Sequence, residues 1–267
     1  MNKNIKAFFI DLDGTMVDDK HNVSKENIMQ IRKTIKEGQH VVISTGRMDK
    51  TVTDIMRKCD VDYAVTGNGA IIIDKKGKVL NEKTLTVKQT QQALALTQKH
   101  GLVMRIDSGP MAFGTYKWWQ KKMVKMANLT PQPNWNFNMK KHYHKIVIWG
   151  TSKGKIKNLI PLFEKAVPGT SIVSSMGGWT LEITNEKATK GNGNQWVAKH
   201  LLKITKKSEM IHIGDTMNDS TTKDVCQLVA MGTATKELKS YAMFVGPKSK
   251  SGAVAKILQG KYTKIKS

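Results

Sequence analysis

Short apolar runs alternate with amphipathic segments in the first part of the chain. Apolar and β-branched residues fill positions 8–10, 40–44 and 63–65, and each run has the length of a buried strand. Between them, apolar residues recur at helical spacing after Ser24 and again after Asp49, two residues that could cap helices. Strands that alternate with helices indicate a parallel sheet covered by helices.

The pattern changes in the middle of the chain. Residues 70–73 and 79–80 flank a Lys75-Lys76-Gly77 turn and predict a hairpin. Strand and helix patterns then follow without regular alternation, and residues 114–136 combine aromatic side chains with no clear period. We therefore expect residues 82–184 to form a smaller, separate α+β domain inserted into the first one.

The first pattern returns after this insertion. Residues 191–202 have helical spacing, whereas the basic chain after Gly260 is expected to be frayed. Strands are predicted at 210–213, 228–231 and 243–245. We expect residues 1–81 and 185–267 to form one α/β core with a doubly wound, Rossmann-like parallel sheet.

Polar residues directly follow several of the predicted strands. They are Asp11 and Asp13, Thr45-Gly46-Arg47, Asn68-Gly69, and Asp215 with Asn218 and Asp219. Because the carboxyl ends of parallel strands meet at one edge, where open α/β folds bind ligands, we expect these residues to form one site. Turns placed by chance would fall equally often at the opposite edge.

The first of these groups contains two carboxylates. Asp11 and Asp13 lie too close together for both charges to coexist in a dry site, and a divalent cation such as Mg²⁺ would relieve the repulsion. Gly14 would allow the backbone to turn sharply at the strand end. An EF-hand loop is excluded, because it places its glycine later and ends in glutamate. Taken alone, however, the motif is equally compatible with an acidic turn that caps a strand.

Several other residues suit a phosphate ligand. Thr45 can donate its hydroxyl, and the Gly46 amide can approach an oxyanion closely. Lys190 precedes Gly191 at a predicted helix start, where it would add to the positive end of the helix dipole. Asp215 could complete a carboxylate set with Asp11. Taken alone, the Thr45-Gly46-Arg47 motif could equally be the segment that leads into the next helix. Lys190, taken alone, could be an ordinary lysine of a lysine-rich chain.

The remaining candidates have supporting roles. Asn218 and Asp219 could orient the phosphate, the lysine or metal-bound waters, although Asn218 also suits a helix cap. We expect Asn68 to support its turn first and the substrate second. His212 lies inside a predicted strand and is expected to be a core residue.

The composition is that of a globular protein. The chain has 267 residues, 39% of them hydrophobic and 24% charged. No apolar run has the length of a membrane span, and the N-terminal run ends too soon for a signal peptide. Cys59 and Cys226 lie far apart, a pattern more typical of reduced core thiols than of a disulfide or a metal site. We therefore expect a cytoplasmic protein with no membrane partner.

The net charge of +23 could favour nucleic acid, an anionic membrane or anionic small substrates. Base-edge and bidentate phosphate readers usually favour arginine, but the basic residues here are nearly all lysine. The only arginines are Arg32, Arg47, Arg57 and Arg105. Because the lysines are also spread along the chain, a general basic surface is favoured and no nucleic-acid partner is expected.

In this order, the motifs resemble the haloacid dehalogenase-like hydrolase superfamily, and most closely its Cof-type phosphatases, which carry a large cap after the second motif. The matching motifs are Asp11-Leu12-Asp13-Gly14-Thr15, Thr45-Gly46-Arg47, Lys190-Gly191 and Gly214-Asp215-x-x-Asn218-Asp219. Thr216 stands where the family often has glycine or serine. The inserted domain matches by length and position more than by residues.

The resemblance implies a role for each catalytic residue. Asp11 would attack phosphorus to give an aspartyl-phosphate, and Asp13 would protonate the leaving alcohol and then activate water. Mg²⁺ would bind the Asp11 carboxylate, the Asp13 backbone carbonyl and Asp215. Thr45 and Lys190 would hold the phosphoryl oxygens, and the cap would close over the substrate.

These roles predict a Mg²⁺-dependent phosphatase of small phosphorylated metabolites, sugar phosphates foremost. A phosphomutase on the same core is an alternative, and a basic nucleic-acid-binding protein is a more distant one. Leaving-group contacts are expected from the cap, where Arg105, Lys145 and Trp179 are candidates. The motifs identify neither the particular substrate nor the oligomeric state.

Overall fold

The computed structural model of the protein describes residues 4–107, 109–126, 128–133, 135, 138, 141–150, 156–175, 178–248 and 252–265. The chain divides into two compact units. The first unit combines Met1–Glu82 with Thr189–Ser267, and the second is Lys83–Ala188. The polypeptide therefore leaves the first unit once and returns to it, and the two units are described in turn.

The first unit is built on a nine-stranded sheet of order β15-β14-β13-β12-β1-β2-β3-β4-β5. Its centre is parallel, because β1 (Ala7–Ile10) pairs in parallel with both β2 (His40–Ser44) and β12 (Met210–Gly214). The other strands are β3 (Tyr63–Thr66), β4 (Ile71–Asp74), β5 (Val79–Glu82), β13 (Gln227–Ala230), β14 (Phe244–Val245) and β15 (Thr263–Lys264). This sheet confirms the predicted α/β core.

Both edges of the sheet are antiparallel. β4 and β5 form the predicted hairpin at one edge. At the other edge, β15 pairs with β14, with Phe244 opposite Lys264 and Val245 opposite Thr263. The expectation of a frayed tail after Gly260 is therefore wrong. The basic composition gave no sign of the short strand β15, which is held by backbone pairing to the sheet edge and not by apolar side chains.

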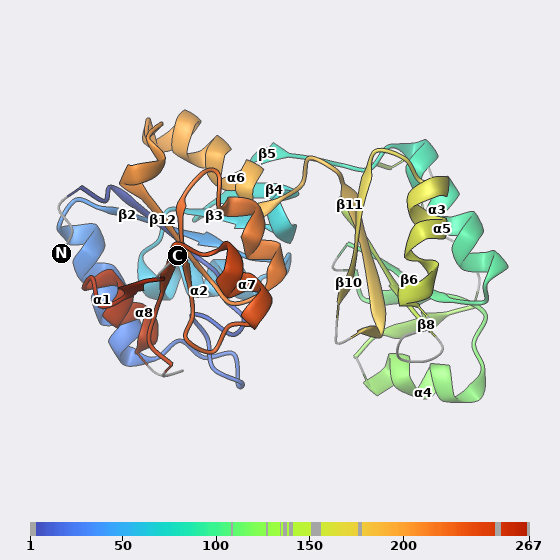
Figure 1. The fold of residues 1–267 in the computed structure, drawn as a ribbon. Helices are drawn as coiled ribbons and strands as arrows, with labels where there is room; N and C mark the ends of the chain where they lie inside the picture. The colour runs from blue at the N-terminus through green and yellow to red at the C-terminus, as the bar shows by residue number, and fades with distance from the viewer. Residues whose placement is uncertain are drawn as a thin grey trace. The chain divides into compact units, whose positions relative to one another are not determined.

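Helices lie on both faces of this sheet. They are α1 (Lys25–Lys36), α2 (Thr51–Cys59), α6 (Lys190–Val197), α7 (Lys236–Tyr241) and α8 (Ala253–Leu258). Figure 1 shows α6 on one side of the sheet and α1 and α8 on the other. On β1, Phe8 and Ile10 pack in one hydrophobic cluster and Ala7 and Phe9 in a second. A strand buried on both faces reads as a continuous apolar run, and this explains the 8–10 pattern.

The second unit is a six-stranded sheet of order β10-β11-β9-β6-β7-β8. Its strands are β6 (Val103–Ile106), β7 (Met111–Phe113), β8 (Thr130–Gln132), β9 (Lys145–Trp149), β10 (Thr170–Ser175) and β11 (Thr180–Asn185). Two helices, α3 (Val87–Lys99) and α5 (Ile160–Ala166), lie side by side against it (Figure 1). The sequence pattern predicts a helix over residues 155–166 despite Pro161, and residue 155 lies outside the described residues. Pro161 is tolerated because it lies in the first turn of α5.

One prediction for this unit is wrong. Residues 114–136 were expected to be irregular, but they contain helix α4 (Trp118–Met126) and strand β8. Among the described residues of this segment, Val124 and Leu129 pack inward, in a small cluster with Val103 and Ala112. A glutamine and three lysines interrupt the apolar residues of this nine-residue helix, so the sequence shows no clear helical period.

None of the helices in the described part of the chain has the length and apolar character that a membrane span requires. Cys59 and Cys226 are buried and not joined in a disulfide.

Candidate active site

Four neighbouring strands bring the predicted polar groups to one edge of the sheet. Asp215, Asp11 and Thr45 directly follow β12, β1 and β2, which are adjacent and parallel. The turn with Asn68 follows β3, the next strand in the sheet. The register thus places residues that are distant in sequence at one place in space, as open α/β sheets do for their ligands.

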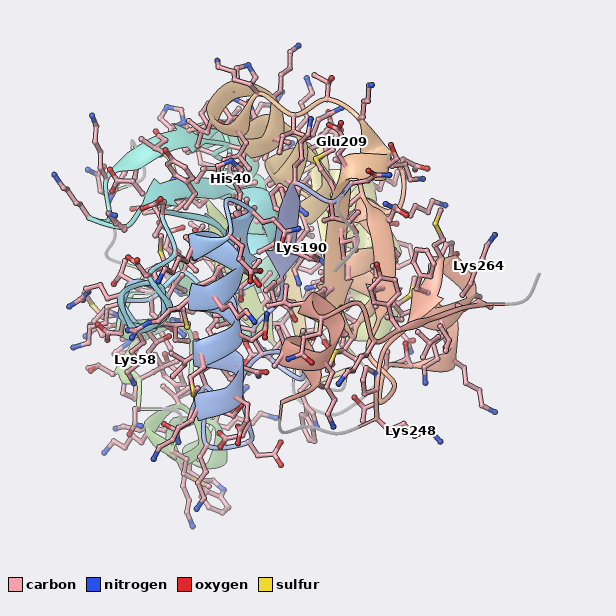
Figure 2. The ribbon with its side chains drawn as sticks, turned by 90° about the vertical axis from the view of Figure 1, so that its left-hand side faces the viewer. His40, Lys58, Lys190, Glu209, Lys248 and Lys264 are labelled. Atoms are coloured by element: carbon pink, nitrogen blue, oxygen red, sulfur yellow. The ribbon has the colours of Figure 1, made fainter. Side chains whose placement is uncertain are left out.

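Lys190 lies at the centre of this group. It is the first residue of α6, which Thr189 caps by accepting a hydrogen bond from the Asn192 amide at 3.1 Å. Its side chain is fully buried, with Nζ 2.7 Å from Asp11 Oδ1 and 2.6 Å from Asp219 Oδ1. In Figure 2, Lys190 lies within the fold, whereas the exposed Lys58 lies at its surface. A buried ammonium requires such paired carboxylates to offset its desolvation.

Asp219 holds this lysine through a carboxylate that accepts four hydrogen bonds. It accepts hydrogen bonds from Lys190, from His212 Nε2 at 2.8 Å, and from the backbone amides of Asp215 and Thr216 at 3.0 and 3.1 Å. Burial alone would raise the pKa of Asp219, but the Lys190 charge and the His212 hydrogen bond hold it well below its usual range. A carboxylate has about four lone-pair positions, so four donors leave Asp219 none for a metal.

Asp11 and Asp215 form the second acidic feature of the site. Burial raises the pKa of Asp11 to about 8 despite the neighbouring Lys190. Burial, with the Asp219 charge, raises the pKa of Asp215 to about 6. Oxygens of Asp11, Asp215 and Asp219 lie within 4.8 Å of one another. Two carboxyl groups this close need a shared proton or a cation, so this pair could hold a metal ion.

Gly14 and Gly214 are required by close approaches at this site. Gly14 has a φ of +76°, and a Cβ built on it would lie 2.1 Å from Asp215 Oδ2. A Cβ on Gly214 would lie 2.2 Å from Asp219 Cγ. Any larger residue at either position would displace an acidic side chain of the site.

Asp13 lies apart from this buried group, in contact with Arg47. Its side chain is 54% exposed and accepts from Arg47 Nε at 2.8 Å and again from the second guanidinium nitrogen. His21 Nδ1 is 2.7 Å from the same guanidinium. The hydrogen bond from Arg47 lowers the pKa of Asp13. Sequence reasoning identified both motifs but missed this pair and His21, which carries no motif signal.

The remaining predicted residues connect the loops at the strand ends. Thr45 is buried, and its hydroxyl accepts the Arg47 amide at 3.2 Å. Asn68 has a φ of +57°, and its side-chain oxygen accepts from Asn218 Nδ2 at 3.0 Å. Asn218 is not a helix cap, because Thr216 caps the short helix Met217–Thr222 in a capping box with Asp219. Gly46 is close to Asn68, whose Oδ1 would lie 3.1 Å from a Cβ built on it.

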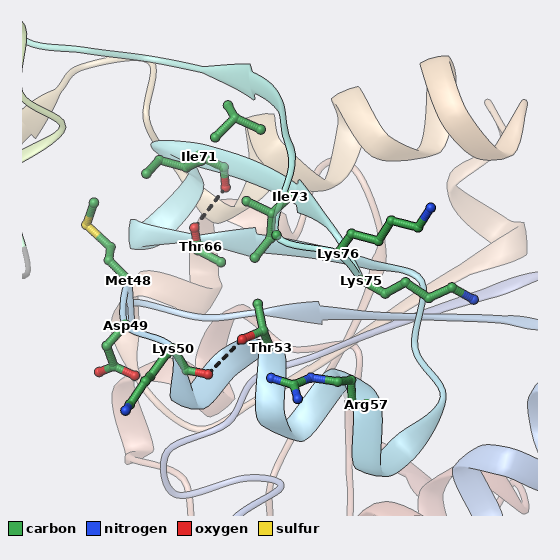
Figure 3. Close-up of a pocket in the computed structure, with 12 residues that line it drawn as sticks. Met48, Asp49, Lys50, Thr53, Arg57, Thr66, Ile71, Ile73, Lys75 and Lys76 are labelled. Carbon is green, nitrogen blue, oxygen red and sulfur yellow. Dashed lines mark hydrogen bonds between the residues drawn. The ribbon is translucent and has the colours of Figure 1, made fainter.

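Two sets of residues lie elsewhere. The three suggested leaving-group contacts belong to the second unit, with Arg105 on β6, Lys145 on β9 and Trp179 just before β11. In the first unit, a groove lies between α2 and the β4–β5 hairpin (Figure 3). Its volume is about 610 Å³. Its lining includes Lys50, Thr53, Arg57, Ile71, Ile73 and Val79 and none of the predicted site residues.

Comparison with known proteins agrees with this geometry. The family model of haloacid dehalogenase-like hydrolases matches residues 8–258. Phosphatase YwpJ of Bacillus subtilis is 25% identical, covering 89% of this chain and 93% of its own length. The phosphatase YcsE of the same organism is named for 5-amino-6-(5-phospho-D-ribitylamino)uracil. It is 26% identical, and the match covers 96% of this chain and 95% of the length of YcsE. A solved sugar phosphatase of subclass IIB of this superfamily has a TM-score of 0.77 at 19% identity, covering 96% of this chain and 98% of its own.

The family model spans nearly the whole chain, and the motif residues expected from the resemblance meet at one edge of the core sheet. The chain therefore belongs to the haloacid dehalogenase-like hydrolase family.

Proposed function

We propose that this protein is a Mg²⁺-dependent phosphatase that hydrolyses phosphate monoesters of small metabolites, sugar phosphates foremost, through an aspartyl-phosphate on Asp11. The enzyme class, a phosphoric monoester hydrolase, follows from the family and from its phosphatase relatives. The metal, the intermediate and the substrate are our inference. The observation that carries it is the buried contact of Lys190 Nζ with Asp11 and Asp219, beside Asp215.

The proposed chemistry has two steps at phosphorus. An oxygen of ionised Asp11 attacks the phosphorus atom, the ester bond breaks, and the leaving alcohol takes a proton from Asp13. Asp13 then accepts a proton from water, whose oxygen attacks the same phosphorus and releases phosphate and free Asp11. Lys190 lies 2.7 Å from Asp11 Oδ1, so its charge would favour the ionised nucleophile and offset charge on the phosphoryl oxygens.

The residues present suit Mg²⁺. The carboxylates of Asp11 and Asp215 are hard oxygen ligands whose mutual repulsion a cation would relieve. By resemblance, the Asp13 backbone carbonyl would be the third protein ligand. When bound, the ion would neutralise negative charge next to the reacting phosphate. Asp219 would remain outside the ligand set, because all of its lone-pair positions already accept hydrogen bonds.

Phosphate would be held by groups at the ends of β2 and β12 and at the start of α6. We assign the Thr45 hydroxyl, the Gly46 amide, Lys190 and the Asn218 side chain to this role, because they surround the edge at which Asp11 lies. Asp13 is ionised and tied to Arg47 in this structure. It must therefore leave that contact and take up a proton from solvent before it can give one to the leaving alcohol.

We expect Mg²⁺ to stabilise the protein, and to do so more strongly at pH 8 than at pH 5. The pKa values of about 8 for Asp11 and about 6 for Asp215 lie above the ordinary value of 3.8. The metal-free folded protein therefore binds protons that the unfolded chain does not, and its stability falls as pH rises through this window. Mg²⁺ competes with those protons, so its effect grows with pH. At 100 times its Kd, it should add about 2.7 kcal/mol to the free energy of unfolding.

Thermal unfolding with Mg²⁺ or with EDTA at both pH values measures this difference. Asp215→Asn should abolish the effect of the ion, and Asp224→Asn, the same change at an exposed position, should preserve it. A Mg²⁺ shift that is equal at both pH values would contradict the assignment of the ion to this carboxyl pair.

The function itself is tested by phosphate release from a panel of phosphorylated metabolites with and without Mg²⁺. The panel should include hexose and pentose phosphates and the ribitylaminouracil phosphate for which YcsE is named. Release of inorganic phosphate in proportion to substrate loss supports a phosphatase. Conversion to an isomeric sugar phosphate without release would instead support the phosphomutase alternative.

A further inference from the structure

A line of buried polar side chains runs from the core of the first unit to the candidate active site. Ser44 Oγ donates to Asn194 Oδ1 at 2.8 Å, and Asn194 Nδ2 is 3.1 Å from His212 Nδ1. His212 Nε2 is 2.8 Å from Asp219 Oδ1. All four residues have no solvent exposure. The line joins strands β2 and β12, helix α6 and the short helix that carries Asp219.

The donor and the acceptor of each hydrogen bond in this line can be assigned from the Asp219 end. Asp219 is ionised and can only accept, so His212 Nε2 carries the proton and donates it. His212 Nδ1 is then an acceptor, which the Asn194 amide satisfies. The Asn194 oxygen in turn accepts from Ser44. Every polar atom in the line has a partner of the right kind, and a single tautomer of His212 fits.

The imidazole in this line is neutral. Burial lowers the pKa of His212, and the nearby positive charge of Lys190 acts in the same direction, against the pull of Asp219. A neutral ring can orient Asp219 without competing with Lys190 for its negative charge. The carboxylate charge therefore remains available to the lysine.

A purely space-filling role would not require a histidine here. Phe9, its neighbour on β1, is apolar and fully buried, so the surroundings accept an apolar side chain. A buried imidazole without hydrogen bonds would be costly, and this one has partners on two other elements.

We infer that His212 is a positioning residue of the active site: with Asn194 and Ser44 behind it, it fixes the Asp219 carboxylate that in turn holds Lys190 against Asp11. This inference rests on the proposed function, because it gives the Lys190–Asp11 contact a catalytic purpose. The chemistry stays with Asp11 and Lys190, and His212 acts through Asp219.

The test compares two substitutions of nearly equal size. His212→Gln can still donate from its side-chain amide toward Asp219, whereas His212→Leu cannot. With p-nitrophenyl phosphate and Mg²⁺, we expect His212→Leu to lower kcat by about 10- to 100-fold, the usual effect of losing an outer-shell partner, with KM changed less than about threefold. His212→Gln should recover most of the lost kcat.

Two further measurements separate positioning from general stability. Gln30→Leu removes a buried polar group that bonds Thr34 and Gln259, away from the site, and should leave kcat unchanged even if it lowers the melting temperature. Ring ¹⁵N chemical shifts should show His212 as the neutral Nε2–H tautomer in the wild-type protein. The opposite tautomer or a charged ring would overturn the inference without reference to activity.

The possible outcomes are distinct. Equal kcat values for His212→Leu and wild type would overturn the inference, as would a His212→Gln variant no better than His212→Leu. If His212→Leu does not fold, Ser44→Ala decides: a lowered kcat at unchanged KM supports the line, and wild-type kcat refutes it. Failure of the wild-type protein to hydrolyse any phosphate ester would instead overturn the proposed function.

Discussion

Asp11→Asn should lower kcat for an aryl phosphate by about four orders of magnitude or more and leave the fold intact. The substitution keeps the shape of the side chain but removes the oxygen nucleophile on which the proposed intermediate depends. Stability should not suffer, because burial already disfavours the charged form of Asp11 and raises its pKa to about 8. Lys190 would keep its partner Asp219.

Steady-state phosphate release and thermal unfolding test the two halves of this expectation. Asp60→Asn is the matched control: it is the same chemical change at an exposed position after α2, where φ is +59° and asparagine is well tolerated. The control should have wild-type kcat. An Asp11→Asn enzyme that kept a tenth of the wild-type kcat would rule out Asp11 as the nucleophile.

The core fold and much of the candidate site could be predicted because their signals are local. The apolar run 8–10 is buried on both sheet faces, and such strands show in the sequence without reference to partners. Asp11, Thr45 and Asp215 directly follow adjacent parallel strands. Once the strands are recognised, parallel pairing is enough to bring these three residues together.

The parts that could not be predicted depend on where side chains point in the folded protein, or on helices whose apolar residues show only a weak period in the sequence. Asp13 lies in a clear motif, but its contact with Arg47 depends on the tertiary structure. The positions of the two residues in the sequence do not predict it. His212 was rightly expected to be buried, but its hydrogen bonds come from residues 18 and 7 positions away on other elements. Helix α4 is short, and lysines and a glutamine interrupt its apolar residues, so its sequence shows no clear helical period.

Lys190→Met should be the most destabilising single change in the site. It leaves Asp11 and Asp219 buried without their shared cation, and removal of one partner from a buried ion pair costs about 3–5 kcal/mol. Loss of the ammonium should also lower kcat by at least about 100-fold, as loss of one oxyanion donor does. Urea unfolding and steady-state kinetics measure the two effects, and the exposed Lys199→Met is the control.

The loss of stability should grow between about pH 5 and pH 8. Without the Lys190 charge, which now lowers the pKa of both Asp11 and Asp219, these carboxyls would bind protons more tightly in the folded state. Folding would then be favoured at low pH and opposed as they ionise. Adding Asp219→Asn to Lys190→Met removes one of the two uncompensated charges, so it should restore part of the stability and none of the activity. If the double variant regained activity as well, Lys190 would serve only to neutralise Asp219, and its proposed contact with the phosphoryl group would have to be abandoned.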